Sequence, residues 1–227
     1  MRTHLVLRYK QSYLIRTSSG YCLIDTGHLN HFLDFKSALF NNGINYSEIN
    51  NVILTHHHED HTGYAYRLLK ETKAQLIVHQ NALPYLIKGT HDEKGVHWNV
   101  YVDKILNITS KIIKFGHKFE PIQTQKGDLI INRNIFNLKN VGIDGKILFT
   151  PGHTSDSISI ILSNGDTFVG DVAMNILGLG RISKRPFFVQ NLNQIFESWR
   201  FLQREGAKMI FPAHGSPFLA DNFKSTI

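Results

Sequence analysis

Apolar and polar residues alternate along the chain with two different periods, one typical of strands and one typical of helices, and both periods occur in both halves. Runs rich in β-branched and aromatic residues, bounded by turn residues, predict strands at 5–7, 12–16, 21–24, 49–54, 75–79, 147–149, 157–162, 167–169 and 209–211. Apolar residues at helical spacing predict helices over 31–42, 64–72 and 192–204. Asn164-Gly165 joins two of these strands, and this dipeptide favours a type I′ hairpin turn.

The order of strands followed by a helix occurs in both halves, and no Gly/Ser/Pro-rich linker divides the chain. We therefore expect residues 1–227 to form a single domain of two stacked α+β halves. A length of 227 residues, with 42% apolar and 19% charged residues, suits a folded core and excludes a disordered or fibrous chain. Residues 84–126 show no clear period, and a helix over 100–108 is the one element predicted there.

The chain has one cysteine but 13 histidines, and this contrast limits the chemistry it can carry. Cys22 lies inside an apolar run, so we expect a buried and inert thiol. A single cysteine excludes a disulfide framework and a cysteine-based zinc site. Any metal must therefore be held by histidines and carboxylates.

The charge balance favours anionic partners without selecting one. Lys and Arg number 25 against 18 Asp and Glu, which gives a net charge of +7. The densest basic cluster, residues 181–185, is too short for a nucleic-acid-binding tract, so a small and possibly anionic substrate is preferred to RNA. The N-terminus turns polar too early for a signal peptide, and no run reaches the length of a membrane span. We therefore expect a cytoplasmic location, and the oligomeric state stays open.

Residues 56–61 read His-His-His-Glu-Asp-His and follow the predicted strand at 49–54. Because alternate residues of an extended backbone face the same side, His56 and His58 can converge while the residue between them points elsewhere. Asp60 and His61 follow where the chain bends. Imidazoles with a carboxylate suit zinc, with iron or manganese as alternatives. An exposed His-rich loop that binds metal incidentally is the competing interpretation.

Three further strand ends carry the same residue types. His153 follows a Thr-Pro-Gly turn, Asp171 ends the predicted hairpin, and His214 ends the last predicted strand. Together with residues 56–61 they resemble the metallo-β-lactamase-fold hydrolases. The family pattern of His-x-His-x-Asp-His, Pro-Gly-His-Thr, Gly-Asp and Ala/Gly-His-Gly occurs here in order. This resemblance is specific for the fold and the metal site but not for the substrate.

The resemblance implies a four-layer αββα sandwich with two divalent metal ions at one edge. It implies that His56, His58 and His153 hold the first ion, that Asp60, His61 and His214 hold the second, and that Asp171 bridges both. It further implies attack by a hydroxide shared between the ions, with Asp60 as the catalytic residue that orients it or protonates the leaving group. Asp25 matches a family position near this edge, where it either fixes a ligand imidazole or only forms a turn.

Motif details favour one branch of the family. The Thr before the His run and the Pro-Gly-His-Thr sequence resemble the glyoxalase II group, which cleaves thioesters, whereas Met174 stands where related lactonases carry a tyrosine. We therefore predict a glyoxalase-like, dinuclear zinc hydrolase that cleaves an ester, thioester or lactone in a small substrate. Two alternatives stay open. One is a phosphodiesterase or endoribonuclease acting on RNA or nucleotides, and the other is a non-catalytic member that binds metal or ligand.

The remaining candidates have weaker patterns. Histidines without partner spacing are expected at the surface or in the core: His79, His91, His97 and His117. Candidates for lining a substrate cleft are Trp98, Tyr101 and the segment 176–188. Candidates for gripping an anionic group are Arg181, Lys184 and Arg185, with an ordinary solvated loop as the alternative.

Overall fold

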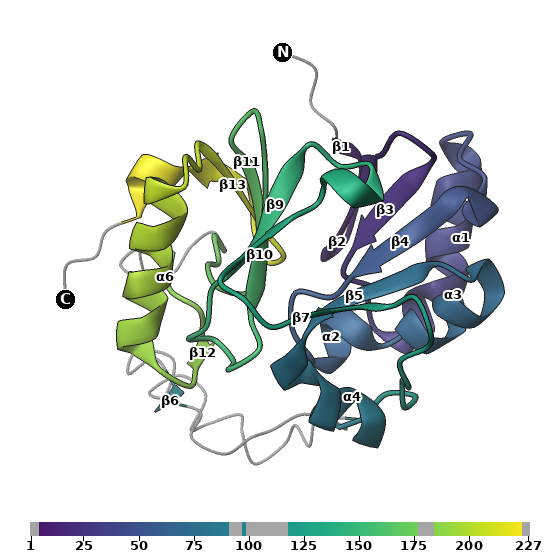
Figure 1. The fold of residues 1–227 in the computed structure, drawn as a ribbon, viewed down its shortest axis with the longest axis horizontal. Coiled ribbons are helices and arrows are strands. Elements are labelled where there is room, and N and C mark those ends of the chain that lie inside the picture. Colours follow the sequence, from purple (N-terminus) through teal and green to yellow (C-terminus); the bar gives the residue numbers. More distant parts are fainter. Residues whose placement is uncertain (1–4, 91–96, 99–117, 177–183, 224–227) are drawn as a thin grey trace.

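Two six-stranded sheets lie face to face in the computed structural model, and helices cover the outer face of each sheet (Figure 1). The structure describes residues 5–90, 97–98, 118–176 and 184–223. The layers follow the order helix, sheet, sheet, helix. The predicted α+β class and the αββα sandwich are therefore confirmed.

The first sheet combines an antiparallel meander with parallel strands. In spatial order it consists of β1 (Leu5–Tyr9), β2 (Ser12–Arg16), β3 (Tyr21–Ile24), β4 (Ile49–Ile53), β5 (Gln75–His79) and β7 (Leu129–Ile131). The strands β1 to β3 pair antiparallel, whereas β3, β4, β5 and β7 run parallel. Parallel strands bring their carboxyl ends to the same edge, so the loops after β3, β4 and β5 lie close together.

The second sheet is mostly antiparallel. Its spatial order is β14 (Phe218–Leu219), β13 (Met209–Pro212), β11 (Asp166–Gly170), β10 (Ile158–Leu162), β9 (Gly145–Phe149) and β8 (Ile135–Asn137). Only β11 and β13 pair in parallel among these strands. A separate two-stranded ladder joins β6 (His97–Trp98) to β12 (Phe188–Val189).

The longer helices cover the outer faces of the sheets. Two of them, α1 (Phe32–Asn41) and α3 (Ala65–Thr72), lie on the first sheet, and α6 (Leu192–Arg204) lies on the second (Figure 1). The side chain of Asn191 accepts a hydrogen bond from the backbone N–H of Gln194, which caps the start of α6. Two short helices, α2 (Glu59–Thr62) and α4 (Leu83–Lys88), occupy the connections after β4 and β5.

Alternation along the strands separates the core into three apolar layers. In β2, Leu14 faces the layer under α1 and α3, whereas Tyr13 and Ile15 face the second sheet. Tyr13 meets Phe168 there with ring centroids 5.0 Å apart. On the far side of the second sheet, Trp199 of α6 is 1% exposed and anchors the third layer. Each sheet is thus apolar on both faces, as the sandwich requires.

Most predicted elements are confirmed, and one turn is wrong. The strands at 12–16, 21–24 and 75–79 and the helix at 192–204 have the predicted bounds. The β10–β11 hairpin forms, but a type I′ turn needs a positive φ at both central residues, and Asn164 has none. Its side chain instead accepts a hydrogen bond from the N–H of Asp166 at 2.9 Å. The sequence does not predict α4, and the helix expected over 100–108 lies outside the described residues.

Two further features follow the sequence analysis. Cys22 is a free thiol, fully buried between the two sheets. In the described part of the chain, no helix has the length and apolar character needed to span a bilayer.

Candidate metal centre

The predicted ligand residues come together where strands of both sheets end. The strand β4 leads to His56 and His58, while β9, β11 and β13 lead to His153, Asp171 and His214. These strands are far apart in sequence, and the sandwich brings their ends to one edge. One ligand atom from each of the seven predicted residues falls into one of two tight groups.

A glycine brings the end of β11 against the loop after β4. Gly170 has a φ of +51°, and a Cβ atom placed there would lie 2.3 Å from Oγ1 of Thr55. Any larger residue would push the two segments apart, so glycine is required. The close approach places the next residue, Asp171, beside the His-rich loop.

The first group consists of three imidazoles. Ring nitrogens of His56, His58 and His153 all lie within 4.8 Å of one another. Nε2 of His153 is 3.2 Å from Nε2 of His56 and 3.1 Å from Nδ1 of His58. His56 and His153 are buried, whereas His58 is partly exposed. Three nitrogens that converge in this way can form one face of a metal-binding site.

The second group contains two imidazoles and two carboxylates. Atoms of Asp60, His61, Asp171 and His214 lie within 4.8 Å of one another. Nε2 of His214 is 3.0 Å from Oδ2 of Asp60, and Nε2 of His61 is 3.5 Å from the same oxygen. The side chains of Asp60 and His214 are 23% and 25% exposed, whereas that of His61 is fully buried. The group therefore opens to solvent on one side.

Asp171 lies between the two groups. Its Oδ1 is 3.4 Å from Nε2 of His61 and 3.5 Å from Nε2 of His214. Its other oxygen, Oδ2, is 3.7 Å from Nε2 of His153 in the first group. One carboxylate thus presents one oxygen to each group.

Oxygen atoms fix the outer nitrogens of three of these rings. Nδ1 of His153 donates to the carbonyl of Phe188 at 2.7 Å, and Nδ1 of His61 donates to Oδ2 of Asp25 at 2.8 Å. Nδ1 of His56 lies 3.1 Å from Oγ1 of Thr55. A ring nitrogen that donates outward leaves the other nitrogen with a lone pair aimed into the centre. The centre therefore presents acceptor atoms to whatever occupies it.

Asp25 accepts hydrogen bonds from Thr55 as well as from His61. Its Oδ1 accepts from the N–H of Thr55 and its Oδ2 from the Thr55 hydroxyl, both at 2.7 Å. It is 1% exposed and has a φ of +57°, which only a few residue types tolerate. Burial raises the pKa of Asp25, while the neighbouring His61 opposes this shift. Of the two interpretations of Asp25, the structure favours the contact with a candidate ligand imidazole.

The two groups differ in electrostatic character. Burial lowers the pKa of both His56 and His153, so these rings are neutral and available as ligands. Burial also opposes a charge on His61, but three carboxylates, Asp60 foremost, raise its pKa well above the ordinary value. Asp171 is the main cause of the raised pKa of His214. The carboxylates thus favour a positive charge within the second group, which a bound cation would supply.

Two buried atoms test whether metal ions fit here. Nε2 of His61 and Oδ1 of Asp171 are buried, and neither has a hydrogen-bond partner among the described residues. Native proteins rarely bury polar atoms without a partner, and an ion is a common explanation. Neutral imidazoles with carboxylates are the donor set of zinc and related divalent ions. The residues present fit divalent metal ions.

The family model for the metallo-beta-lactamase superfamily matches residues 6–214. The chain belongs to this superfamily. A relative from Methanocaldococcus jannaschii, named as a probable metallo-hydrolase, is 30% identical over 205 residues, which are 90% of this chain and 86% of that protein. A solved metallo-beta-lactamase superfamily protein from Sulfolobus tokodaii superposes with a TM-score of 0.61 at 20% identity, covering 93% of this chain and 76% of that one. The latter likeness bears on the fold alone.

Thioesterases also occur among the superfamily relatives. An atrochrysone carboxyl ACP thioesterase from Aspergillus fumigatus is 24% identical over 169 residues, which are 74% of this chain and 39% of that protein. A second thioesterase of this name, from Aspergillus novofumigatus, is matched over 50% of its length. The chain thus spans half or less of these Aspergillus relatives.

Two residues interleaved in the superfamily motif point away from the centre, as the alternation of side chains predicts for the first of them, His57. Nδ1 of His57 donates to Oδ1 of Asp156 at 2.8 Å, with both side chains fully buried. Glu59 lies 3.2 Å from Nδ1 of His28. Neither belongs to the two groups of ligand atoms.

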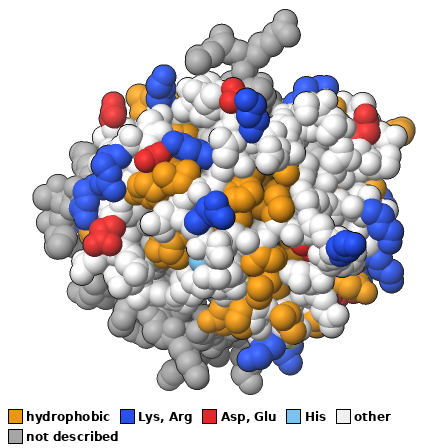
Figure 2. All heavy atoms as spheres, in the orientation of Figure 1, with side chains coloured by type: hydrophobic (Ala, Val, Ile, Leu, Met, Phe, Trp, Pro, Cys, Tyr) orange, Lys and Arg blue, Asp and Glu red, His pale blue; other side chains and the backbone are white. Residues whose placement is uncertain are grey.

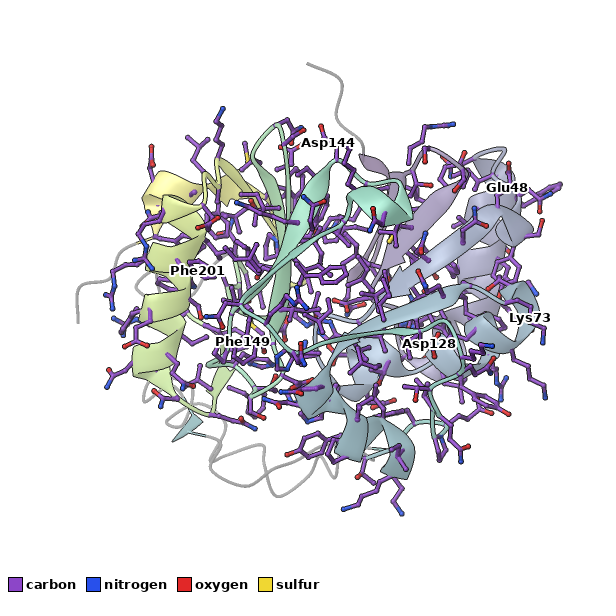
Figure 3. The ribbon with its side chains drawn as sticks, viewed as in Figure 1. Glu48, Lys73, Asp128, Asp144, Phe149 and Phe201 are labelled. Atoms are coloured by element: carbon purple, nitrogen blue, oxygen red, sulfur yellow. The ribbon has the colours of Figure 1, made fainter. Side chains whose placement is uncertain are left out.

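The weaker candidates lie elsewhere or outside the described residues. His79 is a core histidine that stacks on Phe149 of β9, labelled in Figure 3, with ring centroids 4.1 Å apart. Lys184 donates to Oδ1 of Asn175 at 2.5 Å and lies over the Phe218 ring, which is a structural role. The guanidinium of Arg185 lies 5.3 Å from the centre of the Phe196 ring. The structure places His97 and Trp98 on β6, whereas His91, Tyr101, His117 and Arg181 lie outside the described residues.

The sequence analysis misses three residues that support the centre. Asp156 holds His57, while Arg8 and Tyr13 donate to backbone carbonyls around His214. Only Asp156 carries a local signal, because it lies three residues after a predicted ligand. Arg8 and Tyr13 lie some two hundred positions from their acceptors, and no local pattern indicates these contacts.

Proposed function

We propose that this chain is a hydrolase whose centre binds two divalent metal ions, zinc foremost, and cleaves an ester, thioester or lactone in a small substrate. The observation that carries the proposal is the position of Asp171, with one oxygen facing each group of ligand atoms. A carboxylate so placed suits two neighbouring ions better than one. Iron and manganese are the alternatives to zinc, because the same donor set binds them.

The assignment of ligands follows the two groups. His56, His58 and His153 would hold one ion, Asp60, His61 and His214 the other, and Asp171 would contact both. Ions bound there would supply activated water near neutral pH and polarise the bond to be cleaved. Asp25, Thr55 and the Phe188 carbonyl keep the ligand rings oriented.

Exposure indicates the side from which a substrate approaches. His58, Asp60 and His214 are partly exposed, whereas the other members of the two groups are buried. The substrate therefore meets the centre at the partly exposed side chains. We assign Asp60 as the catalytic carboxylate, because it combines access to solvent with a 3.0 Å contact to His214. Asp60 would orient the attacking water, accept a proton from it and pass that proton to the leaving group.

The thioester class has the most support among the substrates. Two relatives are named as thioesterases, and the motifs resemble the glyoxalase II branch. A panel of thioester, activated ester, lactone, β-lactam, bis-aryl phosphate and short RNA separates the classes. We expect the highest kcat/KM on the thioester or ester, and hydrolysis of RNA alone would contradict the proposal.

The net charge of +7 is the observation that favours RNA or a nucleotide as the second candidate. On the face drawn in Figure 2, Lys and Arg side chains are spread out, with uncharged and hydrophobic surface between them. A protein that grips a phosphate backbone usually concentrates its positive charge. RNA binding that weakens steeply with salt would nevertheless favour this candidate.

Metal analysis tests the centre itself. Protein purified without chelator should contain about two equivalents of divalent metal per chain. Less than one equivalent, also after incubation with zinc, iron or manganese, would contradict the dinuclear proposal. Two equivalents without turnover of any substrate in the panel would instead support a non-catalytic binding protein.

A further inference from the structure

Two buried polar side chains beneath the first group have no part in the proposed chemistry. Nδ1 of His57 donates to Oδ1 of Asp156 at 2.8 Å, and both side chains are fully buried. The other oxygen of Asp156 has no hydrogen-bond partner among the described residues. Burying such groups is costly compared with apolar side chains of the same size, so their presence calls for a role other than core packing.

The positions of the two residues suggest that role. His57 lies between His56 and His58, and Asp156 lies three residues after His153. These two loops together supply every member of the first group. The hydrogen bond from His57 to Asp156 thus joins the two loops that carry the converging nitrogens.

The ring of His57 is also held by stacking. The ring of Tyr85, on α4, lies parallel to it at 13°, with centroids 4.0 Å apart. Successive side chains of an extended segment point to opposite sides. Because His57 lies between His56 and His58 in the chain, holding its ring in the interior also restrains the backbone that carries both neighbours.

We propose that His57 and Asp156 are positioning residues for the first metal ion. Their hydrogen bond sets the spacing between the loop of His56 and His58 and the loop of His153. The inference rests on the proposed function, because it requires that the first group binds a metal. It assigns a task to the motif position between the two histidines, and it identifies Asp156 as part of the same unit.

Substitutions at Asp156 separate this role from simple stability. Asp156→Leu keeps the branched side-chain skeleton but removes the acceptor, whereas Asp156→Asn keeps an oxygen that accepts from His57. We expect Asp156→Leu to bind Co²⁺ at the first group about 10- to 100-fold more weakly than the wild type. A loss of this size is typical when a residue that supports a metal ligand is removed. The visible absorption of the bound Co²⁺ should change as well. Asp156→Asn should restore most of the affinity and the spectrum.

Controls distinguish the possible failures. Leu39→Ala removes a fully buried side chain under α1, away from the centre, and measures the effect of lost stability alone. If Asp156→Leu does not fold, His57→Leu provides the same test from the other partner. Wild-type affinities and spectra in these variants, or losses no larger than for Leu39→Ala, would overturn the inference while the proposed function stands. A wild-type protein that binds less than one Co²⁺ would overturn both.

Discussion

His61 donates a hydrogen bond from Nδ1 to Oδ2 of Asp25 at 2.8 Å, and both side chains are buried. Asp25 follows β3 and His61 lies in α2, so the contact joins two loops at the same edge of the first sheet. The donation fixes the tautomer of His61 and directs Nε2 toward Asp60 and Asp171. One carboxylate thereby decides where a neighbouring imidazole presents its lone pair.

The first prediction concerns Asp25→Asn. Asparagine tolerates the positive φ of this position, but it replaces one acceptor oxygen by a donor amide. Either Thr55 or His61 then loses its acceptor, which should destabilise the fold by about 2 kcal/mol. Metal affinity of the second group should fall about 10- to 100-fold. Urea unfolding and competition with a chelator measure the two effects.

A matched control exists on the surface. Asp144 accepts a hydrogen bond from the Ser163 hydroxyl at 2.6 Å in an exposed loop at the top of Figure 3. It precedes β9, whose opposite end leads to His153. Asp144→Asn should leave metal affinity unchanged and alter stability by less than about 0.5 kcal/mol. Equal effects from both substitutions would contradict a special role for Asp25.

The second prediction compares Asp171, which faces both groups, with His58, which belongs to the first group alone. Asp171→Ala removes oxygens that face both groups, so we expect loss of bound metal from both and a drop in kcat of at least about 100-fold. His58→Ala removes a proposed ligand of the first group only, and the second group should still bind metal. Metal content, activity on an activated ester and circular dichroism are the measurements. Unchanged activity in both variants would refute the mechanism.

The third prediction concerns the single thiol. Burial raises the pKa of Cys22 well above its ordinary value, so the folded protein holds the thiol protonated. Thiol reagents should not modify it until the chain unfolds, because the thiolate is the reactive form. The raised pKa also means that stability falls as pH rises above the ordinary cysteine pKa of about 8.5, by up to about 1.4 kcal/mol per unit. Cys22→Ala should lack this contribution to the pH dependence.

The comparison of the two proteins isolates that contribution. Urea unfolding of wild type and Cys22→Ala, measured from neutral to alkaline pH, gives the difference in unfolding free energy at each pH. A difference that stays constant above the ordinary cysteine pKa would mean that the thiol ionises equally in both states. Rapid modification of the native wild type would contradict its burial.

Local patterns predict the elements of this fold and the strand ends at which its proposed ligands lie. The apolar stripe at 192–204 defines α6, and the turn residues around the early strands fix their bounds. The convergence of the seven proposed ligands could be predicted because they follow strands, and strand ends gather at one edge. Non-local partners could not be predicted in this way. His57 meets Asp156 across 99 positions, and only the sandwich decides which side chain covers it.

Charge patterns were less informative than strand ends. Lys184 was a candidate for binding an anionic group, yet its ammonium donates to Asn175 and lies over Phe218. A basic residue in a loop can contact either a bound ligand or a neighbouring side chain, and the sequence does not distinguish these two contacts. The turn at Asn164 shows the same limit, because its side-chain oxygen accepts from the backbone N–H of Asp166 and the turn is not of type I′.

The last prediction concerns the loop that carries His214. Nη2 of Arg8 donates to the carbonyls of Ala213 at 3.2 Å and Gly215 at 2.7 Å, one on each side of that histidine. The hydroxyl of Tyr13 donates to the preceding carbonyl, that of Pro212, at 2.5 Å. The first sheet thus holds a ligand loop of the second sheet. Arg8→Met keeps much of the side-chain length but removes these donors, so the loop should lose its fixed position.

We expect Arg8→Met to weaken the metal site of the second group about tenfold and to leave the first group unchanged, because His214 belongs to the second group alone. Arg16→Met is the matched control. Arg16 also lies on the first sheet, 5.2 Å from the Tyr21 ring, but it contacts no ligand loop among the described residues. A Co²⁺ titration of both variants resolves the two sites. Weakening of both sites by Arg8→Met, or of either site by Arg16→Met, would show that the arginine acts through general stability and not through His214.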